Sequence, residues 1–234
     1  MVGRVLANLW AQALDLVFPV FCLRCRREGA WVCSSCLDLC PPLPLQRCVF
    51  CRSLSSWGAT CNRCSRRHVL AGVTVRGVYQ AWVWRQMIHA WKYRGATELS
   101  PLLRRHLLDT PLPTEIGERL LVIPIPLARQ RRRVRGFNQA EHLALALTGK
   151  GEVASTALRR VRETVPQAAL APLKRQHNML DAFQASAEVR GRACLIVDDI
   201  VTTGATLEAA ARALRSAGAA SVWGVVLVRS ELHV

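Results

Sequence analysis

Acidic residues, lysines and long apolar runs are all scarce in this chain of 234 residues. The chain has only 16 acidic side chains against 32 basic ones, which gives a formal net charge of +16 at pH 7. Just 3 of the basic residues are lysine and 29 are arginine, the residue suited to forked contacts with phosphate. The lack of an uninterrupted apolar run of about 20 residues excludes a membrane-spanning helix. An apolar content of 51% argues against disorder, so we expect a folded protein that suits polyanionic ligands.

The first 20 residues contain Ala11-Gln12-Ala13, which looks like the cleavage site of a secretory signal. The apolar stretch before it is too short for such a signal. Polar residues instead recur along one helical stripe, and apolar residues such as Leu9 and Leu16 recur along the other. The pattern predicts an amphipathic leader helix over residues 1–20.

Eight of the ten cysteines form four CxxC pairs, spaced first as CxxC-x7-CxxC and then as CxxC-x9-CxxC. This spacing is typical of zinc ribbons and predicts two four-thiolate sites. The predicted ligands are Cys22, Cys25, Cys33, Cys36, Cys48, Cys51, Cys61 and Cys64. A disulfide framework would need an oxidising compartment, so we expect two zinc ions and a reducing, cytoplasmic location instead. The spacing leaves open whether the pairs combine sequentially or in a cross-braced way. Cys40 and Cys194 are predicted to be ordinary thiols.

Residues 194–206 combine an apolar strand, two adjacent carboxylates and a loop rich in hydroxyls that opens a helix. The backbone N–H groups of residues 202–206 can converge on one anion, and the helix dipole favours its negative charge. Asp198 and Asp199 would repel a bare phosphate, but they can accept hydrogen bonds from vicinal ribose hydroxyls. The pattern therefore predicts a sugar-phosphate site. The alternative is a strand with an acidic turn and an ordinary helix cap.

All thirteen positions of this segment resemble the 5-phosphoribosyl-1-pyrophosphate (PRPP) binding signature of type I phosphoribosyltransferases. The resemblance implies that Asp198 and Asp199 hold the ribose as the catalytic pair. It also implies that the phosphate is bound by Thr202, Thr203, Gly204, Ala205 and Thr206. The flanking sequence predicts a buried strand at 195–197, a helix at 205–216 closed by a glycine, and a further strand at 222–228, as in a parallel α/β unit.

An amphipathic helix is predicted over residues 79–94. Its apolar residues follow the i, i+3, i+4, i+7 spacing of a buried face: Trp84, Met87, Ile88 and Trp91. Its cations are expected to face away from the core: Arg85, His89 and Lys92. Aromatic residues interleaved with cations can also indicate base stacking, but this spacing favours a core helix.

Five arginines stand within residues 129–135, between a predicted strand at 120–125 and a helix start marked by the capping-box spacing of Asn138 and Glu141. Ligands of doubly wound sheets bind at such strand ends. One interpretation is a pyrophosphate clamp that acts together with Mg²⁺. Its PRPP-binding members would be Arg131, Arg133 and Arg135. The alternatives are a nucleic-acid patch and a solvated charge cluster. The position of the run favours the clamp, and the clamp and the nucleic-acid patch can coexist.

Taken in order, the whole chain resembles the competence protein F (ComF) family, whose members join a double zinc ribbon to a phosphoribosyltransferase-like domain. The segments that carry this resemblance are Lys92-Tyr93-Arg94-Gly95, Pro124-Ile125-Pro126-Leu127, Arg135-Gly136-Phe137-Asn138-Gln139-Ala140-Glu141, Thr164 with Gln167, and Arg175 with Asn178 and Ala182-Phe183. The implied fold class is α/β, a parallel-sheet domain preceded by a small zinc-ribbon module. The expected parts are a leader helix at 1–20, the double zinc ribbon at 21–67, a connecting strand and helical segment with a linker at 68–119, and the PRPP-binding domain at 120–234. The resemblance further implies that residues 159–183 form a flexible hood over the site.

The resemblance implies one of two functions. The first is a glycosyltransferase of the phosphoribosyltransferase type that binds magnesium with PRPP, linked to DNA uptake in natural transformation or to nucleotide metabolism. Its partners would be PRPP and single-stranded DNA or DNA-uptake proteins. The second is a non-catalytic zinc-ribbon protein that binds DNA and uses PRPP as a signal. No segment identifies an acceptor substrate, so the sequence leaves open whether PRPP is turned over.

Overall fold

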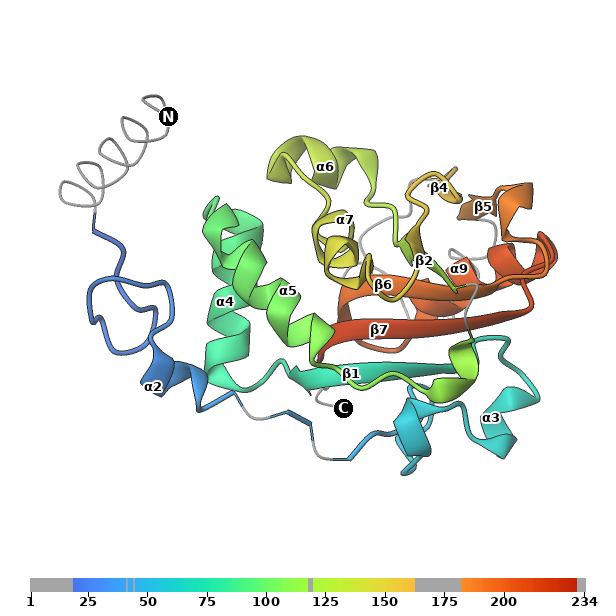
Figure 1. Ribbon diagram of the computed structural model, residues 1–234, viewed down its shortest axis with the longest axis horizontal. Coiled ribbons are helices and arrows are strands. Elements are labelled where there is room, and N and C mark those ends of the chain that lie inside the picture. The colour runs from blue at the N-terminus through green and yellow to red at the C-terminus, as the bar shows by residue number, and fades with distance from the viewer. Residues whose placement is uncertain (1–18, 41, 44, 118–119, 163–181, 231–234) are drawn as a thin grey trace.

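A parallel sheet forms the centre of the computed structural model, which describes residues 19–40, 42–43, 45–117, 120–162 and 182–230 (Figure 1). The sheet has five strands in the order β1-β7-β6-β2-β3, and every neighbouring pair is parallel. The strands are β1 (Gly72–Val78), β2 (Leu120–Pro124), β3 (Glu152–Val153), β6 (Ala193–Val201) and β7 (Ser221–Arg229). The parallel α/β fold predicted from the sequence is confirmed.

Strand β6 lies in the middle of the sheet and carries the two carboxylates. Leu195, Ile196 and Val197 are fully buried, as expected for a strand that is covered on both faces. The sequence predicted a strand that stops before the acidic pair, but β6 continues to Val201 and still pairs with β7 there. The longer strand means that Asp198 and Asp199 lie within the sheet rather than in the loop after it.

One face of the sheet is covered by α4 (Trp82–Tyr93), α5 (Ser100–Leu108) and α7 (Gln139–Ala144) (Figure 1). The predicted apolar face of α4 is confirmed, because all four of its residues are buried: Trp84, Met87, Ile88 and Trp91. Arg85 and His89 are exposed as expected. The prediction for Lys92 is wrong, because its side chain is only 10% exposed and forms an ion pair with Asp199.

The other face is covered by α9 (Ala205–Ser216), which matches the predicted helix at both ends. Gly218 follows the helix with a φ of +97°, the left-handed conformation expected of a closing glycine. An antiparallel pair formed by β4 (Leu158–Arg160) and β5 (Phe183–Ala185) packs in the same core. The remaining short elements are α2 (Ser34–Leu37), α3 (Asn62–Ser65), α6 (Arg129–Arg135) and the 3₁₀ helices η1 (Ser56–Gly58), η2 (Thr97–Leu99), η3 (Thr114–Ile116), η4 (Leu145–Leu147) and η6 (Ala187–Val189).

Strand β1 comes from the segment 68–119, in which a connecting strand was expected outside the PRPP-binding domain. It forms an edge of the main sheet and pairs in parallel with β7, from Gly72 opposite Trp223 to Val78 opposite Arg229. The main sheet therefore includes a strand from before residue 120, the expected start of the PRPP-binding domain.

Two expectations fall on residues outside the described part of the chain. They are the leader helix, of which residues 1–18 are not described, and most of the hood, including Thr164, Gln167, Arg175 and Asn178. Within the described ranges, no helix combines the length and the apolar character needed to cross a membrane.

Candidate functional site

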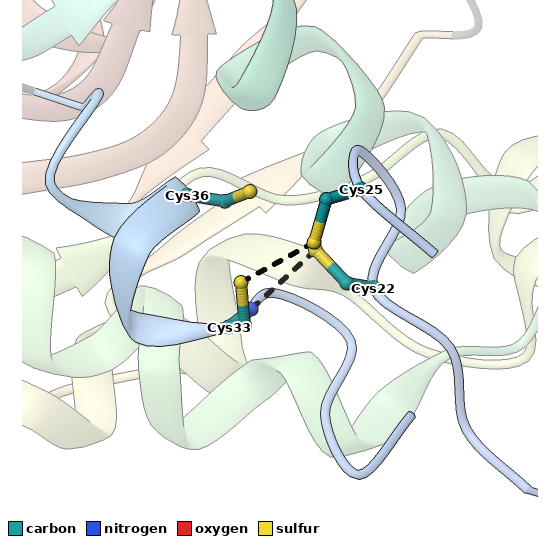
Figure 2. Close-up of side chains that lie close together, drawn as sticks. All are labelled: Cys22, Cys25, Cys33 and Cys36. Carbon is teal, nitrogen blue, oxygen red and sulfur yellow. Dashed lines mark hydrogen bonds between the residues drawn. The ribbon is translucent and has the colours of Figure 1, made fainter. Parts of the chain in front are cut away.

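Each half of the cysteine-rich segment brings its own four thiols together. The first cluster contains Cys22, Cys25, Cys33 and Cys36, and the second contains Cys48, Cys51, Cys61 and Cys64. Within each cluster all four sulfur atoms lie within 4.8 Å of one another. Figure 2 shows the first cluster, with Cys36 on α2 and the other thiols turned toward it from the preceding chain. The pairs therefore combine sequentially, which decides between the two arrangements that the spacing allowed.

Both clusters fit a tetrahedral metal ion. Zinc bound by four thiolates at about 2.3 Å keeps its sulfur atoms about 3.8 Å apart. The Sγ atoms of Cys25 and Cys33 are 3.5 Å apart, and those of Cys51 and Cys61 are also 3.5 Å apart. The two four-cysteine clusters can thus hold metal ions such as zinc.

The other two thiols behave differently. Cys40 and Cys194 are buried outside the clusters, and burial raises the pKa of each thiol to about 11. A buried thiol with a raised pKa is a poor nucleophile and a poor metal ligand. This agrees with their prediction as ordinary thiols.

The loop that joins β6 to α9 surrounds a small pocket. Thr202 and Thr203 precede Gly204, whose φ of +80° turns the chain into the helix. The pocket is lined by Asp198, Ile200, Val201, Thr202, Thr203, Gly204, Ala205, Thr206 and Leu207. All five predicted loop residues and one of the two carboxylates therefore line one hollow at the N-terminus of a helix, where an anion is favoured. A larger hollow between β5 and α9 contains none of the predicted site residues.

The two carboxylates have different surroundings. Asp199 is 7% exposed and forms an ion pair with Lys92 of α4. Burial works to raise the pKa of Asp199, but the Lys92 ammonium, together with Asp198 and Arg135, outweighs burial and holds that pKa below its usual range. Asp198 lines the loop pocket, and burial together with the Asp199 charge raises its pKa well above the usual range. The pair thus combines one carboxylate that stays ionised with a neighbour that holds its proton more readily.

Lys92 is the residue of this site whose contact could not be foreseen from the sequence pattern. Helical periodicity placed it on the outer face of α4, and the family-like segment Lys92-Tyr93-Arg94-Gly95 was the only signal for a special role. In the structure its partner carboxylate lies on a strand that is distant in sequence.

The arginine run forms the helix α6, an element that the sequence did not predict. Arg131 and Arg133 are exposed, and Arg132 donates to the carboxylate of Glu141 at 3.2 and 3.3 Å. Arg135 donates to Gln139 Oε1 at 3.1 Å and to the Tyr93 hydroxyl at 3.0 Å. Its charge also helps to lower the pKa of Asp199, so of the three predicted clamp residues Arg135 is electrostatically coupled to the acidic pair.

The predicted start of the next helix is confirmed at Asn138. Its Oδ1 accepts from the backbone N–H of Ala140, and its Nδ2 donates to the carbonyl of Ile125, both at 3.1 Å. These two bonds tie the end of β2 to the start of α7. Glu141 pairs with Arg132 of α6, so the capping box is only half formed.

Known proteins resemble this chain in sequence over most of its length. Residues 133–231 match the family described as phosphoribosyl transferase domain. The DNA utilization protein YhgH of Shigella flexneri is 31% identical over 226 residues, which cover 88% of this chain and 96% of that protein. The competence protein ComFC of Bacillus subtilis is 29% identical over 206 residues, covering 85% of this chain and 84% of that protein. Among solved structures, the glutamine PRPP amidotransferase from B. subtilis, complexed with ADP and GMP, has a TM-score of 0.37 at 18% identity, covering 59% of this chain and 30% of that chain.

The parallel sheet, its loop pocket and the match to residues 133–231 define a phosphoribosyl transferase domain, here preceded by two four-cysteine clusters. The extent of the similarity to YhgH then identifies the family. The chain belongs to the competence protein F (ComF) family, together with proteins named for DNA utilization and competence.

Proposed function

We propose that the protein binds PRPP with Mg²⁺ in the pocket after β6 and transfers its phosphoribosyl group to an acceptor. The observation that carries this proposal is the meeting of Asp198 with the backbone of residues 202–206 in one pocket. A helix N-terminus suits the 5-phosphate, and carboxylates beside it suit the ribose hydroxyls. We also propose that the two four-cysteine clusters hold zinc and that the protein works in the reducing cytoplasm.

Each residue of the site would have a separate role in a displacement reaction at the ribose C1 atom. The loop would fix the phosphate, and Asp198 and Asp199 would orient the sugar, with Lys92 keeping Asp199 ionised as an acceptor. The bond from C1 to pyrophosphate breaks as the acceptor supplies the electron pair for the new bond. Magnesium bound with PRPP supplies charge neutralisation for the leaving group. Arg135, close enough to the acidic pair to affect its ionisation, would stabilise the departing charge together with Arg131 and Arg133.

A second candidate function is that of a DNA-binding accessory protein that binds PRPP as a signal without turning it over. The exposed arginines of α6 favour it, because exposed guanidinium groups also contact nucleic-acid phosphates. The names of the relatives, DNA utilization and competence, support a role near DNA uptake. If the protein is instead a phosphoribosyltransferase, its reaction could also serve nucleotide metabolism.

Release of pyrophosphate from PRPP distinguishes the two candidates. The assay would use Mg²⁺ and a panel of purine bases, pyrimidine bases and amines, each with and without single-stranded DNA. If the protein is a transferase, one acceptor should produce stoichiometric pyrophosphate and a phosphoribosylated product. Tight PRPP binding with no pyrophosphate from any acceptor would instead favour the signalling role.

The α6 arginines offer a second test. Replacing Arg131, Arg132 and Arg133 by alanine should weaken PRPP binding much more than ribose 5-phosphate binding if they clamp the pyrophosphate. If they follow a DNA backbone, the logarithmic salt slope of single-stranded DNA binding should flatten by about 0.7 for each phosphate that is no longer neutralised.

The matched control removes three exposed arginines that lie outside both α6 and the cysteine-rich segment: Arg85, Arg105 and Arg190. This control loses the same formal charge as the α6 variant. If the two triple variants show the same PRPP affinity and the same salt slope of DNA binding, the α6 arginines are a solvated charge cluster without a specific ligand.

A further inference from the structure

The second four-cysteine module, residues 45–67, contacts the phosphate loop directly. Val49, which lies inside the CxxC turn of that module, faces Gly204: a Cβ atom on Gly204 would lie 3.0 Å from Val49 Cγ2. Arg52 follows the same turn, and its Nη2 donates to the carbonyl oxygen of Thr202 at 3.1 Å. The turn that supplies two of the four thiols therefore also packs against the loop of the pocket after β6.

The module is attached to the domain on both sides of this contact. Glu208 of α9 accepts from the backbone N–H groups of Val69 and Leu70, both at 3.2 Å. Gln46 forms a reciprocal pair with the backbone of Val75 on β1, at 2.9 and 3.0 Å. Because these bonds fix the module on the sheet edge and on α9, Arg52 approaches the loop from a fixed position.

The first module provides an internal comparison. Arg26 follows its CxxC turn as Arg52 follows the second, and both residues have positive φ angles, +64° and +66°. Their backbone N–H groups also donate to the equivalent carbonyls, of Cys22 and Cys48, both at 3.0 Å. Arg26 is exposed, whereas Arg52 is half-buried against the loop. Both turns therefore share the same backbone conformation, whereas the contact with Thr202 is made by Arg52 of the second module.

The direction of the Thr202 carbonyl matters for an anion site. A loop that presents N–H groups to a phosphate must turn its carbonyl oxygens away, because a carbonyl directed at the anion would repel it. A guanidinium that binds the outer carbonyl favours this orientation and adds a positive charge beside the pocket. We propose that Arg52 is a positioning residue through which the second four-cysteine module holds the phosphate loop in its binding conformation; this rests on the proposed function of that loop.

The test compares Arg52→Ala with Arg26→Ala in the full chain, using ribose 5-phosphate as the ligand in calorimetry. Arg52→Ala should bind ribose 5-phosphate about tenfold more weakly, the loss expected for one charge-assisted hydrogen bond. Arg26→Ala should bind as the unchanged protein does, and Arg52→Lys, which keeps a cationic donor of similar reach, should recover most of the affinity. Metal analysis should give the same metal content for all of these proteins, which separates loop positioning from collapse of the module.

Each outcome has a distinct meaning. Unchanged affinity in Arg52→Ala with full metal content overturns the positioning role and leaves the proposed function intact. Failure of the unchanged protein to bind ribose 5-phosphate overturns the proposed function, and the positioning role with it. If Arg52→Ala loses metal, Arg52→Met takes its place, because it keeps the aliphatic stem while removing every donor; normal affinity in that variant would likewise refute the inference.

Discussion

Changing both carboxylates, Asp198→Asn with Asp199→Asn, is expected to lower the affinity for PRPP with Mg²⁺ by about two to four decades. With both carboxylates ionised in the complex, each would lose a charge-assisted hydrogen bond to a ribose hydroxyl, which costs roughly 1.5 to 3 kcal/mol, and each 1.4 kcal/mol is about a tenfold change. Calorimetric titration with PRPP and magnesium measures the loss. Unchanged affinity would place the ribose elsewhere and remove the main support for the site.

The surroundings of the pair make Asp198→Asn the cleaner control. Asp199→Asn leaves the Lys92 ammonium without its buried partner, so part of its effect would come from a less stable domain. Asp198→Asn keeps that ion pair and replaces a carboxyl group whose charged form is disfavoured by burial and by Asp199. The single variant should therefore lose ligand affinity with no loss in the free energy of unfolding, which separates binding from folding.

The parts of the fold that the sequence predicted are encoded over short distances along the chain. The helix at 205–216, the cap at Asn138 and the ligands of the two four-cysteine clusters all follow from spacings of a few residues. The buried face of α4 follows from periodicity in the same way. Local patterns of this kind fix local conformation and burial, and here they also placed the pocket residues 202–206.

Contacts between distant segments could not be predicted in this way. The Lys92 and Asp199 pair depends on how α4 crosses the sheet, because helical periodicity alone assigns a charged residue to the outer face. The contact of Arg52 with Thr202 spans 150 residues. The sequence also did not predict the helical form of α6, whose Arg132 and Arg135 pair with Glu141 and Gln139 beyond the end of the helix.

The two cysteine-rich modules pack against different parts of the domain. Buried residues of the first join the hydrophobic cluster of α4 and α5, the helices on the face from which Lys92 reaches Asp199. The second packs into the core beneath α9 and contacts the loop that begins that helix. Asp198 and Asp199 are consecutive on a strand, where side chains alternate between faces. Each module therefore packs with the helices of the face on which one of the two carboxylates is expected to lie.

Lys92→Met is expected to lower the free energy of unfolding by about 3 to 5 kcal/mol at neutral pH, because it leaves a buried carboxylate without its cation. The loss should depend on pH. Lys92 lowers the pKa of Asp199 in the folded protein, so its stabilisation is present above the unfolded pKa of about 3.9 and is lost as the pH falls through the folded value. In Lys92→Met, burial instead raises the pKa of Asp199, so the folded variant takes up a proton at low pH. The difference from the unchanged protein should therefore shrink as the pH approaches about 4.

Urea unfolding at neutral pH and near the unfolded pKa of the carboxyl measures this difference, with Arg85→Met as the control because Arg85 lies on the same helix and is exposed. Arg85→Met should change stability little at either pH. Adding Asp199→Asn to Lys92→Met should restore part of the lost stability, since the second change removes the uncompensated charge. The opposite result would be a loss of stability that is equal at both pH values and is not relieved by Asp199→Asn. It would mean that Lys92 stabilises the domain through the packing of its aliphatic stem, and that the ionisation of Asp199 does not depend on Lys92.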